Sequence, residues 1–134
     1  MRRAPYVAAV ALAALAVGAC GKSPEDKARD DGKQVGAAVR DLFDARSLDD
    51  ATSAAGEVRN SVGDVGEDAR KVVESQVATQ SATLSRGVEA LTSGDLNNVK
   101  ESAQQIRAQA ESFRHSDNSI ANEFWRGFEE GYDG

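Results

Sequence analysis

The sequence contains little proline, and Pro5 and Pro24 are the only two such residues. Because proline is the strongest helix breaker among the amino acids, long helices are permitted everywhere after Pro24. The sequence also has one cysteine, Cys20, and one histidine, His115. A disulfide within the chain and a metal site of the usual Cys/His kind are therefore excluded. We expect neither a metal nor a cofactor.

Long apolar runs are scarce as well. The clearest one extends from Val7 to Val17, which is eleven residues, and counting from Tyr6 to Cys20 gives only fifteen. A helix that spans a membrane needs about 20 apolar residues, so this run is too short for a permanent span. Arg2 and Arg3 precede it, and a charged start followed by a short apolar run is typical of a secretory signal peptide.

The apolar run ends in Val17-Gly18-Ala19-Cys20, which resembles the lipobox of bacterial lipoproteins. The resemblance implies cleavage between Ala19 and Cys20, so that residues 1–19 are the signal peptide, and attachment of a diacylglyceryl group to the Cys20 thiol. The protein would then be anchored to a membrane through this lipid. The alternative is an ordinary secreted protein with an unpaired thiol.

The residue after Cys20 also bears on location. It is Gly21 and not aspartate, and in the lipoprotein family aspartate there tends to retain the protein at the inner membrane. The resemblance therefore implies the outer membrane, facing the periplasm, in a bacterium with two membranes. In a bacterium with one membrane, the same anchor implies its outer face.

The composition of residues 20–134 limits the classes of binding partner and the size of the hydrophobic core. Removing Arg2 and Arg3 leaves 14 basic against 22 acidic residues, a formal charge of 14 − 22 = −8. Nucleic acids and anionic lipid headgroups are disfavoured as partners, because they would meet net repulsion. Leu, Ile, Val and Phe number 21 of these 115 residues. This supply supports one domain, residues 20–134, with a narrow core between helices.

Capping residues and apolar periodicity predict an all-α fold with three helices. Ser23 and Pro24 are typical of a helix start, Ser47 offers a second N-cap, and Gly94 suits a left-handed turn before Asp95. We predict an up-down-up arrangement dominated by a long antiparallel helical hairpin, with helices over residues 24–46, 48–92 and 95–130. No strand pattern or glycine-rich nucleotide loop is present.

Three features of this prediction have alternatives. Gly63 lies in the middle of the second helix, where a glycine costs about 1 kcal/mol relative to alanine, so a break there is an alternative to a continuous helix. The polar residues 115–119 allow the third helix to bend or restart. The first helix either packs on the hairpin or forms a mobile stalk near the lipid.

Four of the six aromatic residues after Cys20 lie between residues 124 and 132. On a helix, Trp125, Phe128 and Tyr132 share one face. One interpretation is that they fill space beside the small residues of 55–63 in the hairpin. Another is an exposed partner-binding patch that includes Arg126, since tryptophan, tyrosine and arginine dominate interface energies. A third is an aromatic belt at a membrane surface.

No other residues form a recognisable catalytic or binding group. His115 is expected on the surface, and the acidic pairs lack the spacing of a calcium-binding loop. No nucleophile and base stand at a spacing that indicates catalysis, so we do not expect an enzyme. The leading hypothesis is a membrane-anchored lipoprotein with a structural or protein-interaction role, through an envelope protein or self-association. The alternative is a periplasmic binding module for a small apolar or lipid-like ligand.

Overall fold

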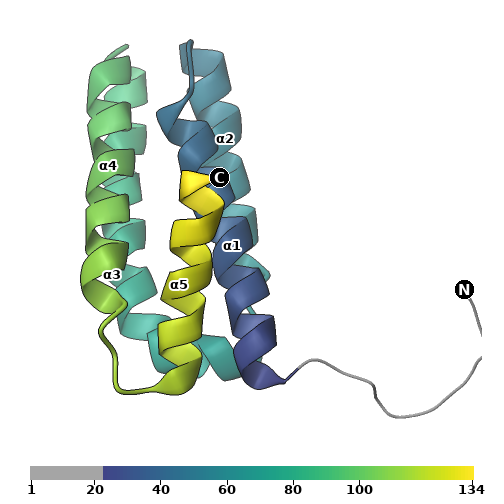
Figure 1. The fold of residues 1–134 in the computed structure, drawn as a ribbon. Coiled ribbons are helices and arrows are strands. Elements are labelled where there is room, and N and C mark those ends of the chain that lie inside the picture. Colours follow the sequence, from purple (N-terminus) through teal and green to yellow (C-terminus); the bar gives the residue numbers. More distant parts are fainter. Residues whose placement is uncertain (1–22) are drawn as a thin grey trace, which may run out of the picture.

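A computed structural model describes residues 23–134, which form an all-α bundle of five helices (Figure 1). The helices are α1 (Pro24–Phe43), α2 (Leu48–Gly63), α3 (Glu67–Thr92), α4 (Leu96–Phe113) and α5 (Ser119–Asp133). The prediction of three helices is therefore wrong, although the all-α class is confirmed. Within the described residues, no helix is both long enough and apolar enough to cross a membrane.

The second predicted helix is interrupted at residues 64–66, which separate α2 from α3. The Nη2 atom of Arg70 donates to the carbonyl oxygens of Gly63 at 2.7 Å and Val65 at 3.1 Å. Asp31 of α1 accepts a hydrogen bond of 2.9 Å from the backbone nitrogen of Gly66. The break is stable because these side chains satisfy backbone groups that the helix would otherwise pair.

The third predicted helix is interrupted at residues 114–118, between α4 and α5. The side chain of Asn118 accepts a hydrogen bond of 3.0 Å from the backbone nitrogen of Ala121 and caps α5. Asn122 donates from its amide to the carbonyl oxygen of Arg114 at 2.6 Å. Asn118 in this segment and Asn122 in the first turn of α5 thus bond to the backbone, as asparagine does at helix starts, and the chain turns.

The predicted helix starts and the turn at Gly94 are confirmed. The side chain of Ser23 accepts from the nitrogen of Asp26 at 3.2 Å, and Ser47 caps α2 in the same way. Gly94 has a φ of 76°, in the left-handed region that favours glycine. The side chain of Asp95 then caps α4. The helical hairpin about this turn is α3 with α4, and not the longer pair that we predicted.

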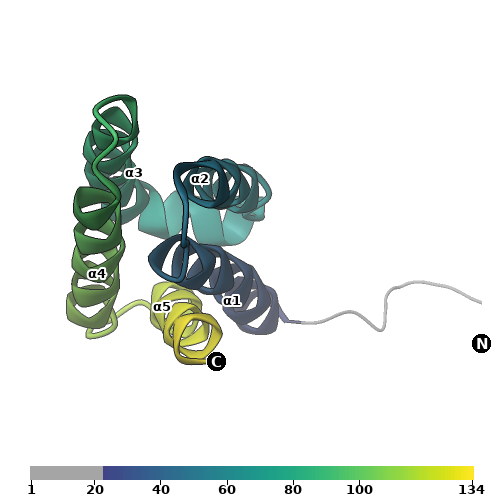
Figure 2. The same ribbon diagram turned by 90° about the horizontal axis from the view of Figure 1, so that it is seen from above.

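The helices form two layers, which Figure 2 shows from above. One layer holds α2, α1 and α5, with α1 in the middle, and the other holds α3 and α4. Both views show the beginning of α3 crossing under the first layer before it turns to run beside α4. The first helix therefore packs against each of the other four and is not a stalk.

The closest packing in the bundle joins α1 and α5, and it depends on glycine. A Cβ atom placed on Gly32 would lie 1.9 Å from the carbonyl oxygen of Phe124, and one on Gly127 would lie 2.0 Å from that of Arg29. Gly36 and Gly131 make equivalent contacts one turn further on, which shows that the two helices run parallel. Such contacts need residues without side chains at a four-residue spacing.

This packing corrects the expected neighbours of the C-terminal aromatic residues. We expected residues 124–132 to lie opposite residues 55–63 of the hairpin. They lie instead on α5, which packs mainly against α1. The break at residues 114–118 turns α5 away from the line of α4, and the paired glycines allow α1 to approach it.

Candidate functional site

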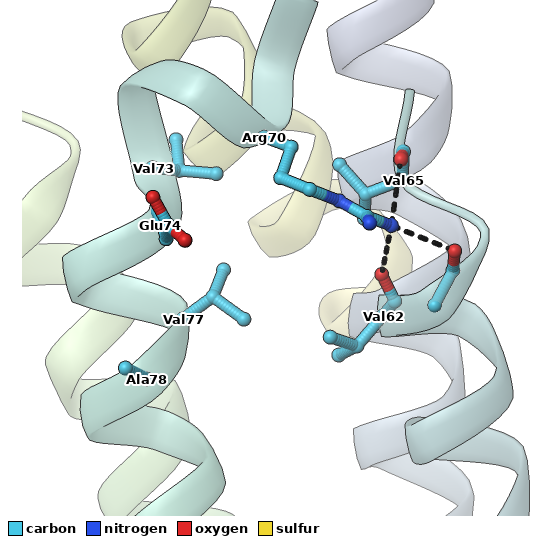
Figure 3. A pocket seen from close by; sticks show the side chains of 8 residues that line it. Val62, Val65, Arg70, Val73, Glu74, Val77 and Ala78 are labelled. Atoms are coloured by element: carbon cyan, nitrogen blue, oxygen red, sulfur yellow. Dashed lines mark hydrogen bonds between the residues drawn. The ribbon is translucent and has the colours of Figure 1, made fainter. Parts of the chain in front are cut away.

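The feature best suited to binding is a cavity of about 290 Å³ between the end of α2 and the first half of α3 (Figure 3). Most of its lining is apolar. The side chains of Val62 and Val65 face those of Val73 and Val77 across the gap. Gly63, Arg70, Glu74 and Ala78 complete the lining. The volume lies just below the range of about 300–1,000 Å³ that is usual for small-molecule sites.

The cavity exists because α2 and α3 diverge after the turn at residues 64–66. There α2 presents valine and glycine and α3 presents valine and alanine, and these short side chains do not reach across the gap. Val65 and Val73 are buried, whereas Val62 and Val77 are half-buried and have one side towards solvent. Deeper in the bundle, Val62 contributes to a smaller void of about 10 Å³. The cavity thus has an apolar floor and an open side.

Two ionisable side chains of α3 line the cavity, and they carry opposite charges. Arg70 is held in place by its Nη2 bonds to the carbonyl oxygens of Gly63 and Val65, with a longer contact of 3.5 Å to that of Val62 (Figure 3). The negative end of the α2 dipole, at the C-terminus of that helix, also stabilises a cation at this point. Glu74 lies one helical turn beyond Arg70 and is exposed.

The structure places the aromatic candidates in the core. Trp125 and Phe128 have no exposed surface, and Tyr132 is 8% exposed. The Trp125 ring lies 4.7 Å from the ring of Phe124 and 5.1 Å from that of Phe113, measured between centroids. Arg126 is exposed and pairs with Glu123 at 3.3 Å. The four residues therefore do not form one surface patch.

Tyr132 lies among cations. The guanidinium carbon of Arg40 is 5.6 Å from the centre of its ring, and that of Arg107 is 5.7 Å away. Burial raises the pKa of the Tyr132 hydroxyl, and the two arginines oppose this shift in part. The arrangement holds the end of α5 between α1 and α4 through cation–π contacts. It is a structural group, because the ring faces the core.

Glu129 is a buried carboxylate that sequence reasoning missed. It forms ion pairs with Arg107, at 3.3 Å, and with Arg114, and so joins α5 to the end of α4. Arg107 also pairs with Asp133 at 3.3 Å. A signal was present in the sequence, because Glu129 lies on the same face as Trp125 and the apolar residues of α5.

The second notable surface is an acidic groove between α1 and α2. We define it by the five acidic residues that line it, Asp41, Asp44, Asp50, Glu57 and Asp64. The pKa of Glu57 is raised, first by a hydrogen bond with the Asp41 carboxyl group, then by burial and by the charge of Asp41. Among residues 23–134, no group of three or more His, Cys, Asp or Glu side chains is arranged to hold a metal ion.

The remaining candidates from the sequence are placed as follows. His115 is exposed in the turn between α4 and α5. The signal peptide, Ala19 and the lipidation residue Cys20 lie outside the described residues. The cavity itself was missed, because Val62, Val65, Val73 and Val77 all lie within the single helix that we predicted over residues 48–92. The glycine at residue 63, where a break was the alternative, was the signal that could have indicated a gap.

Comparisons of this chain with models of protein families, with curated proteins and with solved structures find no match.

Proposed function

We propose that the protein is a lipid-anchored module that binds a small apolar or lipid-like molecule in the cavity between α2 and α3. The observation that carries this proposal is the cavity itself, with valines on both sides and an open face. The other large apolar side chains are used inside the bundle, since Leu48 is the only one among residues 23–134 that is exposed. The proposal assigns no reaction to the protein.

The sequence supports the lipid anchor, through the apolar run and the lipobox-like residues that end at Cys20. Only Gly21, Lys22 and Ser23 separate Cys20 from the start of α1. That end of the bundle also carries the turn between α2 and α3, beside which the cavity lies (Figure 1). A lipid on Cys20 would therefore hold the cavity near the membrane, in the location that we inferred from Gly21.

The anchor is tested by mass spectrometry of the mature N-terminus. We expect a diacylglyceryl-modified cysteine as the first residue, and an unmodified Cys20 would contradict the anchor.

Binding is tested by identifying apolar molecules that co-purify with the full-length protein. We expect the wild type to carry such a molecule and Val77→Phe to lose it, because the larger ring occupies the cavity. Ala82→Phe is the matched control, since residue 82 is exposed on the same helix and does not line the cavity. Absence of any apolar molecule from wild type and control would count against the proposal.

A structural or protein-interaction role is the second candidate, and the acidic groove favours it. The carboxylates of Asp41 and Glu57 face each other there, and their hydrogen bond, burial and the charge of Asp41 all contribute to the raised pKa of Glu57. A basic partner would relieve the repulsion between these two carboxylates. Crosslinking in the envelope should then yield a complex that dissociates as salt is raised. Recovery of the monomer alone would count against this role.

A further inference from the structure

The two charged residues at the cavity indicate which lipid-like molecule it accepts, and this inference rests on the function proposed above. Arg70 and Glu74 are four residues apart on α3, so their Cβ atoms are about 5–6 Å apart on the same helix face. Both line the apolar cavity. A ligand whose apolar part lies among the valines thus meets a cation and an anion side by side.

Arg70 is suited to bind a phosphate group. Its bonds to the carbonyl oxygens of Val62, Gly63 and Val65 all use Nη2, and a guanidinium carries five N–H donors in total. The N–H groups of Nε and Nη1 take no part in these three bonds, so they can donate to a phosphate. Because the three carbonyl oxygens fix the group in place, little side-chain freedom is lost when a phosphate binds.

Glu74 distinguishes between headgroups. A free fatty acid or an anionic phospholipid would bring its negative charge towards Glu74 and towards a chain whose residues 20–134 have a formal charge of 14 − 22 = −8. A headgroup that carries an ammonium beside its phosphate avoids this repulsion, because the ammonium pairs with the carboxylate. Charge complementarity therefore favours a zwitterionic headgroup.

The size of the cavity limits the apolar part. A volume of 290 Å³ holds roughly ten groups of the size of a water molecule, at about 30 Å³ each. Part of one acyl chain fits this space, and two chains do not. The open side leaves the rest of the chain and the headgroup at the surface.

We propose that the cavity between α2 and α3 binds one acyl chain of a zwitterionic phospholipid of the phosphoethanolamine class, with the phosphate at Arg70 and the ammonium at Glu74. The source is the membrane to which Cys20 attaches the protein. A chain of four residues, the distance from Cys20 to Pro24, spans at most about 14 Å. A lipid therefore has a short path from the bilayer to the cavity.

The test uses the lipidated protein, residues 20–134, in phosphatidylglycerol vesicles with one of three photoreactive probes. These are lysophosphatidylethanolamine, lysophosphatidylglycerol and a free fatty acid, each with the same diazirine-bearing acyl chain. After illumination, mass spectrometry locates the adducts. We expect adducts on the residues that line the cavity, with the phosphoethanolamine probe exceeding each of the other two by about two- to fivefold, as an exposed charge pair allows.

Two pairs of variants make the result specific. Glu74→Gln should remove the preference for the phosphoethanolamine probe and leave the yield of the phosphoglycerol probe equal or higher. Glu89→Gln, an exposed acidic residue of α3 outside the cavity, should keep the preference. Val77→Phe should abolish cavity adducts of all probes, and Ala82→Phe should not.

The outcomes separate this inference from the proposed function. Equal yields from all three probes at the cavity, a preference for either anionic probe, or a preference that survives Glu74→Gln would overturn the headgroup assignment and leave the apolar binding function in place. Absence of cavity adducts with every probe in the wild type would overturn both.

Discussion

The absence of Cβ atoms at glycine positions determines how closely α1 and α5 approach each other. At Gly32 and Gly127, the position of a Cβ atom is already occupied by a carbonyl oxygen of the facing helix, at 1.9 and 2.0 Å. Because backbone cannot move aside as the end of a side chain does, one methyl group would have to separate the two helices. This separation would weaken the contact between α1 and α5, which is the largest between any two helices of the bundle.

We therefore expect Gly32→Ala to lower the free energy of unfolding by at least about 2 kcal/mol, as overpacking of a close contact does. Urea unfolding followed by the fluorescence of Trp125, the only tryptophan, measures this change. The control is Gly56→Ala on α2, where a Cβ meets nothing within 4 Å. That change should raise stability by about 0.5–1 kcal/mol. Equal effects at the two positions would contradict the packing.

Glu57 provides a prediction about pH. Because its pKa is raised in the folded protein by the hydrogen bond with Asp41 and by burial, the folded state binds a proton more readily than the unfolded state. The stabilisation from this protonation is present at low pH and is lost as pH rises through the raised pKa. Glu57 therefore destabilises the fold at neutral pH, by no more than about 0.5 kcal/mol for an exposed group.

Glu57→Gln removes this charge, and we expect a slightly higher melting temperature at pH 7 than in the wild type. The difference should shrink as the pH is lowered towards 4, because the wild-type carboxyl group takes up its proton as the pH falls. Thermal unfolding followed by circular dichroism across this range measures it. A difference that grows at low pH would show that the sign of the Glu57 pKa shift is wrong.

At the scale of helices, the two short breaks determine the architecture. Asn118 caps α5 through its bond to the nitrogen of Ala121, and loss of such a cap costs about 1 kcal/mol. We expect Asn118→Ala to reduce the free energy of unfolding by this amount. Asn97→Ala, at an exposed position of α4, should change it by less than about 0.5 kcal/mol. Urea titration compares the two, and equal losses would exclude a capping role.

The helix starts were predictable because their signals are local. Ser23, Ser47 and Asp95 each bond to a backbone nitrogen three residues further on, and short-range patterns record such contacts. From the sequence, the break at residues 64–66 was only an alternative to a continuous helix. The side chain that stabilises it is Asp31, which accepts a hydrogen bond from Gly66. Because Asp31 is 35 residues away from Gly66, the local sequence pattern does not indicate this contact.

The pairing of α1 with α5 was missed for the same reason, because it joins the two ends of the described chain. Its signal was nevertheless present, as Gly32 and Gly36 repeat the four-residue spacing of Gly127 and Gly131. Gly63 could indicate a gap, but the shape and lining of the cavity could not have been predicted, because they depend on the angle at which α3 leaves the turn. The valines that line it have the same spacing as valines that fill a core.

At the scale of the whole molecule, the proposed function makes ligand capture depend on the distance between the proposed lipid anchor at Cys20 and the cavity. The start of α1 and the cavity lie at the same end of the bundle, and only three residues separate Cys20 from Pro24. If the cavity takes its ligand from the membrane, a longer tether should weaken capture without altering the fold. The effective concentration falls with about the −3/2 power of linker length.

Inserting about twenty Gly/Ser residues between Lys22 and Ser23 adds a flexible segment of roughly 25 Å. We expect the yield of cavity adducts from the phosphoethanolamine probe to fall on the order of tenfold, with an unchanged melting temperature. The same linker added after Gly134 is the control and should leave the yield unaltered, because it does not move the cavity from the bilayer. An unchanged yield with the inserted tether would show that the ligand reaches the cavity from solution, so that the proposed anchor does not supply the ligand.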